Sequence, residues 1–187
     1  MKKILTAIIL CLSLLGCTSN QEAKVESHKI LVVYFSATNH TKEVAENIAQ
    51  ILDANIVELE PVNEYTEDDL NYNDSSSRTS IEQNDDSMRV EIKNTINIDS
   101  YDTILIGHPI WWGKAPKIIY TFLESYDFSN KNISTFCTSS SSGLGNSAEL
   151  LKEITNGSNI TWLESHRFEI GASQDEIENW LKDIQLY

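Results

Sequence analysis

The chain has 187 residues, of which 14 are basic and 28 are acidic, and its formal net charge is −14. This balance excludes the strongly basic surface that nucleic-acid-binding proteins need, so we expect no nucleic-acid partner. An acidic surface would attract a protein partner with a basic docking surface, although solubility alone also explains such a surface.

The N-terminal residues 1–16 are predicted to be a lipoprotein signal peptide. Lys2 and Lys3 precede an apolar run that is too short for an ordinary membrane span. The run ends in Leu14-Leu15-Gly16-Cys17, which resembles the processing site of bacterial lipoproteins. The resemblance implies cleavage before Cys17, lipid attachment to that residue and a place in the bacterial cell envelope, on the outer face of the cytoplasmic membrane or on the outer membrane. A plain secretory peptide and an uncleaved anchor are the alternatives.

Residues 17–28 are predicted to form a polar tether, and residues 29–187 are numerous enough for one domain with a full core. Loss of Lys2 and Lys3 with the signal would leave 12 basic and 28 acidic residues, a net charge of −16. Cys137 would then be the one cysteine left besides the lipidated one, which rules out an intrachain disulfide. Its strand-like surroundings predict a buried, unreactive thiol.

The domain is predicted to open with a strand at 30–35, a loop rich in hydroxyl groups and a helix. Six consecutive apolar or aromatic residues are typical of a strand buried on both faces of a parallel sheet. Ser36, Thr38 and Thr41 follow, just before apolar residues at helical spacing. Unpaired N–H groups at a helix N-terminus bind phosphate, but Thr41 as a simple N-cap is an equal alternative. The lysine of a P-loop and the glycines of a dinucleotide motif are both missing.

The next part of the chain combines a regular and an irregular segment. Residues 54–61 alternate in polarity and predict a second strand, which completes a right-handed βαβ unit. Residues 63–84 form a long acidic loop, which is usually functional or mobile. Arg78 in this loop could bind a phosphate, but balancing nearby carboxylates is the favoured interpretation. A weak helical pattern runs through residues 81–96.

A third buried strand is predicted at 103–107, followed by the loop His108-Pro109-Ile110-Trp111-Trp112-Gly113 and a helix at about 115–123. Adjacent side chains outside a helix point in roughly opposite directions, so only one tryptophan can enter the core. The other needs a flat partner, and a planar aromatic cofactor would supply one by stacking. The alternative is that both indoles pack beneath neighbouring loops.

The last third predicts two more strands. A strand at 133–137 leads into residues 138–147, whose small side chains would let the backbone approach a ligand, and then into a helix. Part of 160–170 is predicted as a strand interrupted near 164–166, and 175–184 as a closing helix capped by Ser173. Among the histidines, His40 and His108 are expected on ligand-facing loops. No Cys/His cluster has metal-ligand spacing.

The alternation of strands and helices predicts an α/β fold with a doubly wound, five-stranded parallel sheet, strand order 2-1-3-4-5 and helices on both faces. The unusual loops follow the first, third and fourth strands. In such sheets the carboxyl ends of strands form the ligand-binding edge at the point where the strand order reverses.

In these three loops, and across about residues 29–186, the sequence resembles the flavodoxin family. Residues 36–41 resemble the family's phosphate loop, residues 109–113 the first isoalloxazine loop, and residues 138–146 the second. The resemblance implies a flavodoxin-like fold with non-covalently bound FMN. The implied FMN-binding residues are Ser36, Ala37, Thr38, Asn39, His40, Thr41, Pro109, Ile110, Trp111, Trp112, Gly113, Thr138, Ser139, Ser140 and Gly143.

The sequence departs from the family pattern in the phosphate loop and in the second flavin loop. Asn39 and His40 stand where relatives often have Gly-Asn, and Asn tolerates a left-handed backbone. Ser140 and Ser141 stand where relatives often have glycines, and strain there would weaken flavin binding if positive φ is needed. The second flavin loop lacks an aromatic residue that could cover the second face of the flavin ring. Either Tyr72 covers this face, or the face stays open to a substrate.

The resemblance implies a lipid-anchored electron carrier that works between membrane-associated redox partners. Such a carrier needs no catalytic residue or metal ligand of its own, and we expect a monomer. Two alternatives remain: a flavin-dependent reductase of quinones or small electrophiles, and a flavin-free interaction module on the same fold.

Overall fold

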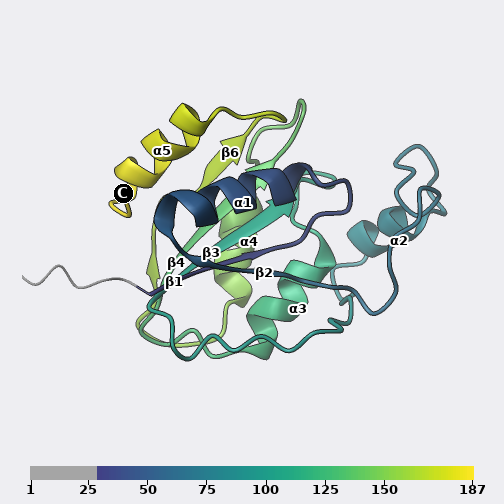
Figure 1. The fold of residues 1–187 in the computed structure, drawn as a ribbon. Coiled ribbons are helices and arrows are strands. Elements are labelled where there is room, and N and C mark those ends of the chain that lie inside the picture. The colour runs from purple at the N-terminus through teal and green to yellow at the C-terminus, as the bar shows by residue number, and fades with distance from the viewer. Residues whose placement is uncertain (1–28) are drawn as a thin grey trace, which may run out of the picture.

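The computed structural model describes residues 29–187, in which a parallel sheet lies between two layers of helices (Figure 1). The predicted signal peptide at 1–16, the lipidated Cys17 and the tether at 17–28 lie outside the described residues. The strands are β1 (Ile30–Tyr34), β2 (Asn55–Glu58), β3 (Thr103–Pro109), β4 (Asn132–Thr138), β5 (Thr161–Trp162) and β6 (His166–Phe168). The helices are α1 (His40–Leu52), α2 (Arg78–Asn84), α3 (Lys117–Ser125), α4 (Ser147–Ile154) and α5 (Gln174–Asp183). Within residues 29–187, no helix has the length and apolar character of a membrane span.

The sheet has the predicted strand order, β2-β1-β3-β4-β5, and its strand pairs are parallel. The fifth position is divided, because β5 pairs with the start of β4 while β6 pairs with its end. At the break, the Ser134 hydroxyl donates to the Glu164 carbonyl at 2.7 Å and the Thr135 hydroxyl to the Ser165 hydroxyl at 2.8 Å. These side chains replace the missing backbone pairs, at the interruption that the sequence predicts.

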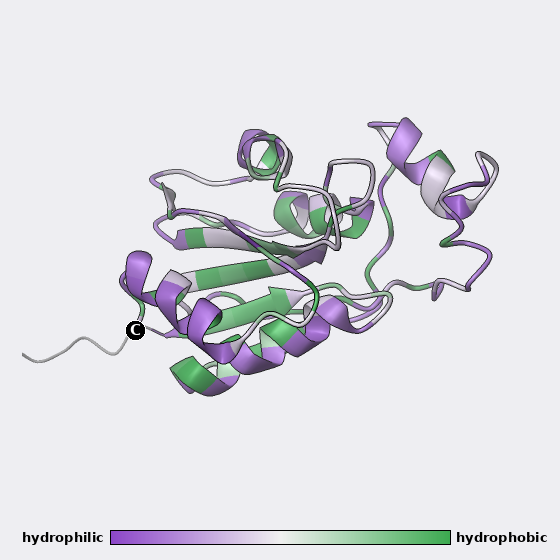
Figure 2. Ribbon diagram, turned by 90° about the horizontal axis from the view of Figure 1, so that it is seen from above, coloured by the Kyte–Doolittle hydropathy of each residue, from purple (hydrophilic) through white to green (hydrophobic). Residues whose placement is uncertain are grey.

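The central strands are buried on both faces, because successive side chains alternate between two cores. Leu31 and Val33 of β1 pack on the side of α3 and α4, and Val32 and Tyr34 pack on the side of α1 and α5. Figure 2 shows the hydrophobic strands between flanking helices. The predicted cap of α5 is confirmed, since the Ser173 hydroxyl accepts a hydrogen bond from the Glu176 N–H at 3.2 Å.

The chain between β2 and β3 differs from the prediction. The helix there is α2, capped by Ser77, and the expected helical pattern over 81–96 is wrong beyond Asn84. Met88, Val90 and Ile92 recur every second residue, which is the period of extended chain, and Ile92 forms an isolated antiparallel bridge with Pro61. Val90 and Ile92 of this extended chain therefore contact the core without forming a helix.

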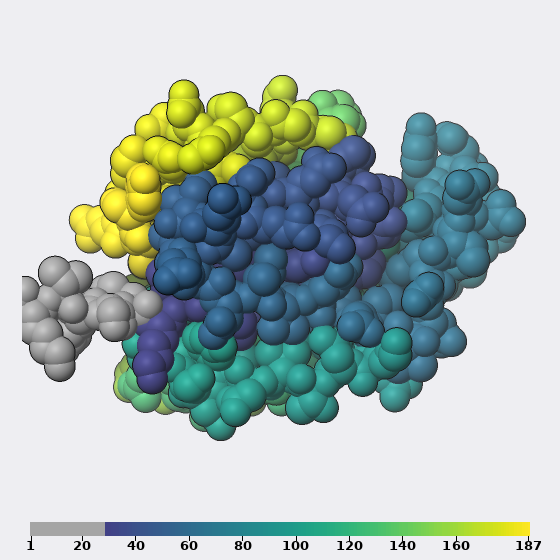
Figure 3. Space-filling view, in the orientation of Figure 1, coloured from purple at the N-terminus to yellow at the C-terminus, as the bar shows by residue number. Residues whose placement is uncertain are grey.

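Residues 61–86, called the excursion below, project beyond the carboxyl ends of the strands and form a lobe at one end of the molecule (Figures 1 and 3). Arg78 stabilises it from within. Its Nε lies 2.7 Å from Glu82 Oε1, its Nη1 donates to the Asn63 carbonyl at 2.8 Å, and its guanidinium stacks 3.9 Å from the Tyr65 ring centroid. The interpretation of Arg78 as a partner of carboxylates is thus confirmed.

His108 does not lie on a ligand-facing loop, because β3 continues through it to Pro109. Its side chain is fully buried, and its Nδ1 lies 3.0 Å from the Pro109 carbonyl oxygen. Nε2 has no hydrogen-bond partner among the described residues. Burial disfavours the charged ring and lowers the pKa of His108 to about 4.

We expect His108 to make the domain less stable in mild acid. In the unfolded chain this imidazole takes up its proton near pH 6.5, and in the folded domain only near pH 4. As the pH falls through this window the unfolded state binds the extra proton, which costs the folded state about 3 kcal/mol. Urea unfolding of wild type and His108→Gln at pH 7 and pH 4.5 should show the smaller loss for the variant. Equal losses would contradict a neutral buried imidazole.

A second prediction concerns Gly107, where the Phe136 ring of the neighbouring strand leaves no room for a side chain. A Cβ atom at Gly107 would lie 2.3 Å from Phe136 Cζ. Gly107→Ala should lower the free energy of unfolding by about 1–3 kcal/mol, because the buried ring cannot move freely. Gly143→Ala is the control, since no atom of the part of the chain that the structure describes would lie within 4 Å of its Cβ. Equal urea midpoints for the two variants would refute the packing argument.

Candidate functional site

The loop between β1 and α1 presents a run of unpaired backbone donors. Among the described residues, no hydrogen bond is donated by the backbone N–H groups from Ser36 to Lys42. Asn39 precedes the helix with φ +66, so the left-handed backbone expected there is present. The Asn39 side chain accepts no hydrogen bond from the backbone N–H groups of α1. The N-terminus of α1 is therefore open to an anion, as a phosphate loop requires.

Thr41 is not the N-cap of this helix, so that alternative is wrong. The left-handed turn at Asn39 starts the helix at His40, which places Thr41 inside its first turn. The Thr41 side chain is buried, and its Oγ1 lies 2.8 Å from Oγ1 of Thr138 at the end of β4. This hydrogen bond joins the first and third of the predicted ligand loops.

The second loop contains a tight turn from Trp111 to Lys114. The Trp111 N–H donates to the Lys114 carbonyl at 2.9 Å, and the Lys114 N–H donates to the Trp111 carbonyl at 3.0 Å. Trp112 has φ +49 and Gly113 has φ +77, which makes this a type I′ turn. A left-handed backbone at a bulky residue costs about 1–2 kcal/mol. Strain of this kind collects at functional positions, and here it holds an indole outward.

The two tryptophans divide as the sequence predicts. Trp111 packs inward, with its ring centroid 5.6 Å from that of Phe35 and 5.3 Å from that of Tyr65, both edge-on. Trp112 is 44% exposed. Trp111 thus anchors the loop to the core and to the excursion, and Trp112 keeps a free aromatic face for a flat ligand.

The third loop is held in place by polar contacts with β6. The Ser139 N–H donates to the Phe168 carbonyl at 3.2 Å, and Arg167 Nη2 donates to the Ser139 carbonyl at 2.8 Å. Ser140 and Ser141 have no positive φ, so the strain expected at these two positions is absent.

Gly145 brings the second and third loops together. It has φ +59, and a Cβ there would lie 3.0 Å from the Gly113 carbonyl oxygen. A glycine is therefore needed at this contact for both space and backbone geometry.

A cavity of about 540 Å³ opens between the three loops and the excursion. None of the side chains that line it is charged. Its lining residues are Ala37, Thr38, Leu70, Tyr72, Thr79, Pro109, Ile110, Trp111, Trp112, Ser140, Ser141 and Ser142. Aromatic walls and neutral hydroxyl groups suit a flat heteroaromatic ring with uncharged polar edges.

Some predicted site residues lie beside this cavity without lining it. Ser36 lines a neighbouring hollow of about 320 Å³, together with Phe35, Tyr65 and three glutamates. Thr41 and Thr138 bond to each other, and Ser139 supports the third loop through its carbonyl. Asn39, His40, Gly113 and Gly143 do not line the cavity either, although the first two belong to the loop of unpaired donors.

Sequence reasoning missed Leu70 and Thr79 as cavity residues, and it had Tyr72 only as one option for covering a ring. The excursion has no apolar periodicity, and only its unusual length signalled a functional loop.

The expected unreactive thiol is confirmed, because Cys137 is buried and burial raises its pKa to about 12. Within residues 29–187 no group of His, Cys, Asp and Glu side chains could hold a metal ion.

Comparison with known proteins agrees with this geometry. The model of the family described as Flavodoxin matches residues 29–184. A crystal structure from Bacteroides eggerthii, described as a flavoprotein, is 39% identical with a TM-score of 0.77, covering 84% of this chain and 98% of that chain. A second, from Bacteroides uniformis, has the same identity and TM-score over 83% and 98% of the two chains.

A flavoprotein from Lactobacillus acidophilus, solved in complex with FMN, is 23% identical with a TM-score of 0.60 and shares the fold. The alignment covers 82% of this chain and 98% of that chain. Among curated proteins none matches. The family match spans the sheet, the three loops and the closing helix, and by this match the chain belongs to the flavodoxin family.

Proposed function

We propose that this domain binds FMN non-covalently and transfers electrons between redox partners. One observation carries the proposal. Ala37 and Thr38 belong to the run of unpaired N–H groups and also line the uncharged aromatic cavity. One ligand with a phosphate at one end and a flat ring at the other would therefore fill both. Membership of the flavodoxin family and the FMN bound to the Lactobacillus acidophilus protein support this choice of ligand.

The residues present fit such a ligand. The N–H groups of 36–42 with the hydroxyls of Ser36 and Thr38 would hold the phosphate. Trp112 would stack on the ring, and Ser140 would lie at its edge, where both line the cavity. Thr41 and Thr138 would support the site without touching the ligand, because their mutual hydrogen bond fixes the phosphate loop against the third loop. FMN supplies the one- and two-electron chemistry, and the protein binds, orients and shields it.

A flavin-dependent reductase of quinones or small electrophiles is the second candidate. It is favoured by Tyr72, which lines the cavity yet is 75% exposed, so that side of the site is open enough for a small substrate. The case for a flavin-free interaction module depended on strained serines in the third loop. That case is weaker now, because Ser140 and Ser141 are unstrained.

The proposal includes a lipid anchor at Cys17 in the bacterial cell envelope and a redox partner with a basic docking surface. Cleavage before Cys17 rests on the sequence of its processing site. An acidic docking surface on this chain, facing the basic partner, is supported by the distribution of charge. The chain carries no Lys or Arg between Asp53 and Ser77, a segment that includes the first part of the excursion beside the cavity. The carrier would act as a monomer.

Flavin binding is tested by the visible spectrum of the purified full chain and by titration with FMN, followed by quenching of flavin fluorescence. Trp112→Asn should bind FMN about fivefold more weakly, because the stacked indole is lost while Asn suits the type I′ turn. Trp162→Phe, outside the cavity, is the control and should bind normally. A colourless protein that leaves FMN fluorescence unquenched would refute the proposal. Oxidation of NAD(P)H by a quinone in the presence of the holoprotein would favour the reductase over the carrier.

The lipid anchor is tested by fractionating cells that express the full chain. Cys17→Ser should move the protein from the membrane fraction to the soluble fraction, because the acylated residue is lost. Cys11→Ser, within the predicted signal peptide, is the matched control and should stay with the membrane. Membrane retention of Cys17→Ser would contradict lipidation.

A further inference from the structure

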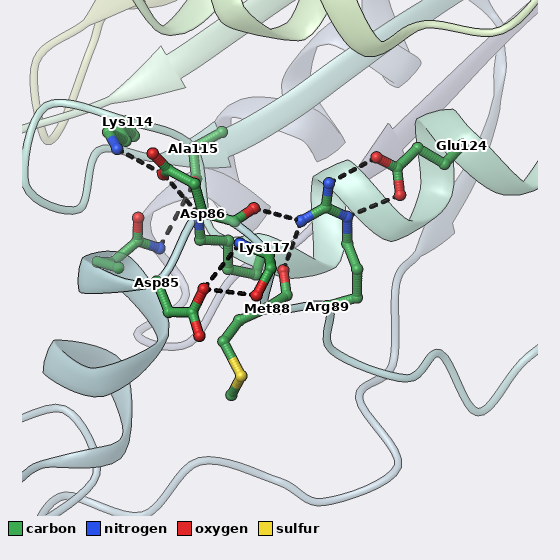
Figure 4. Close-up of polar contacts among 10 residues, drawn as sticks. Asp85, Asp86, Met88, Arg89, Lys114, Ala115, Lys117 and Glu124 are labelled. Atoms are coloured by element: carbon green, nitrogen blue, oxygen red, sulfur yellow. Dashed lines mark hydrogen bonds and ion pairs between the residues drawn. The ribbon is translucent and has the colours of Figure 1, made fainter.

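Two lysines beside the Trp112 turn share one carboxylate oxygen at the end of the excursion (Figure 4). Lys114 Nζ lies 2.7 Å from Asp86 Oδ1, and Lys117 Nζ lies 3.2 Å from the same atom. Lys114 closes the Trp111–Lys114 turn, and Lys117 is the first residue of α3. Neither lysine lines the ligand cavity.

The burial of these groups is unequal. The Lys117 side chain is fully buried, and the Asp86 side chain is 80% exposed. The Asp86 carboxylate therefore faces solvent on one side and the buried Lys117 ammonium on the other. Among the described residues it is the one carboxylate paired with Lys117, whose Nζ also lies 4.9 Å from the Tyr120 ring centroid. Lys114 is partly exposed, so water screens its pair with Asp86 more strongly.

The chain around Asp86 is fixed to α3 at a second point. Arg89 forms two hydrogen bonds with Glu124, Nε to Oε2 at 2.7 Å and Nη2 to Oε1 at 2.6 Å. Its Nη1 donates to the Asp86 carbonyl at 2.8 Å. These bonds hold the Asp86 backbone, and they leave its carboxylate directed at the two lysines, as Figure 4 shows.

Asp86 thereby connects two walls of the cavity. One wall is the turn that carries Trp112, which Lys114 closes. The other is the excursion, which ends at Asp86 and contributes Leu70, Tyr72 and Thr79. A weaker link runs in parallel, where Gln83 Nε2 donates to the Ala115 carbonyl at 3.4 Å.

We infer that Asp86 is a positioning residue for the flavin site, because its carboxylate holds Lys114 and thereby fixes the Trp112 turn relative to the excursion. This inference rests on the proposed function, since FMN is the ligand for which the walls are positioned. Asp86 itself touches neither the cavity nor its ligand. In the sequence it is one of two adjacent acids, and nothing there separates it from Asp85.

Removing Asp86 alone would also leave Lys117 buried without its carboxylate, and the domain could fail to fold for that reason. Lys117→Met removes this complication, because an apolar side chain of similar length fills the same space without a charge. The positioning effect is then measured in the Lys117→Met chain. Asp85→Asn in that background is the matched control, since within residues 29–187 the Asp85 carboxylate accepts hydrogen bonds from Ser87 alone.

The experiment compares the full chain carrying Lys117→Met with the same chain carrying Asp86→Asn, Asp86→Glu or Asp85→Asn. FMN affinity is measured by fluorescence quenching, and amide hydrogen exchange of residues 111–114 is measured without FMN. Asp86→Asn should weaken FMN binding roughly three- to fivefold and speed the exchange. Asp86→Glu keeps the charge and should restore part of both, and Asp85→Asn should change neither.

Equal affinity and equal exchange for the two asparagine variants would overturn the positioning role. Wild-type chain that binds no FMN would refute the proposed function instead. In that case the exchange of residues 111–114 would still decide whether Asp86 holds the turn. High salt should reduce the difference between Asp86→Asn and its parent, because ions screen a partly exposed pair.

Discussion

The parallel pairing of the sheet is the constraint on which the site depends. β3 pairs in parallel with β1 on one side and with β4 on the other, so each crossover returns the chain to the same starting edge of the sheet. The loops that follow these strands therefore all leave from the same edge of the sheet and lie next to one another there. The hydrogen bond between Thr41 and Thr138, and the contact of Gly145 with Gly113, are local consequences of this pairing. They tie three loops that are distant in the chain into one surface.

Much of this arrangement could be predicted from the sequence, because the strongest signals lie in the buried elements. The apolar runs of β1 and β3 predict strands that are buried on both faces, and Ser173 with Glu176 marks the start of α5. The errors fall where the signal is short or ambiguous. The apolar residues in 88–92 recur at the spacing of an extended chain, and this spacing is easily mistaken for a weak helical pattern. β3 continues through His108, since pairing with β4 extends the strand beyond its apolar residues. The contributions of Leu70 and Thr79 depend on tertiary placement, which no local pattern encodes.

The second loop shows how packing and strain are combined at the site. Trp111 is packed between Phe35 and Tyr65, so the turn is fixed on its inner side. This anchoring allows Trp112 to stay in a left-handed backbone that it would not adopt in a free peptide. Tyr65 belongs to the excursion and Phe35 follows β1, so one indole joins the core, the phosphate loop and the lobe. The backbone that carries the exposed Trp112 ring is fixed by the same turn, and a fixed backbone loses little entropy when a ligand stacks on that ring.

The phosphate loop has a consequence for electron energetics. It offers N–H and hydroxyl donors, but no arginine, and its lysine, Lys42, lies 4.0 Å from Glu58. A phosphate held by neutral donors keeps its negative charge, within a chain whose net charge is −14. An electron added to a ring beside that phosphate would meet a negative charge that only neutral donors stabilise, which raises the energy of the reduced form. If FMN binds as proposed, this loop would therefore lower the reduction potential of the flavin.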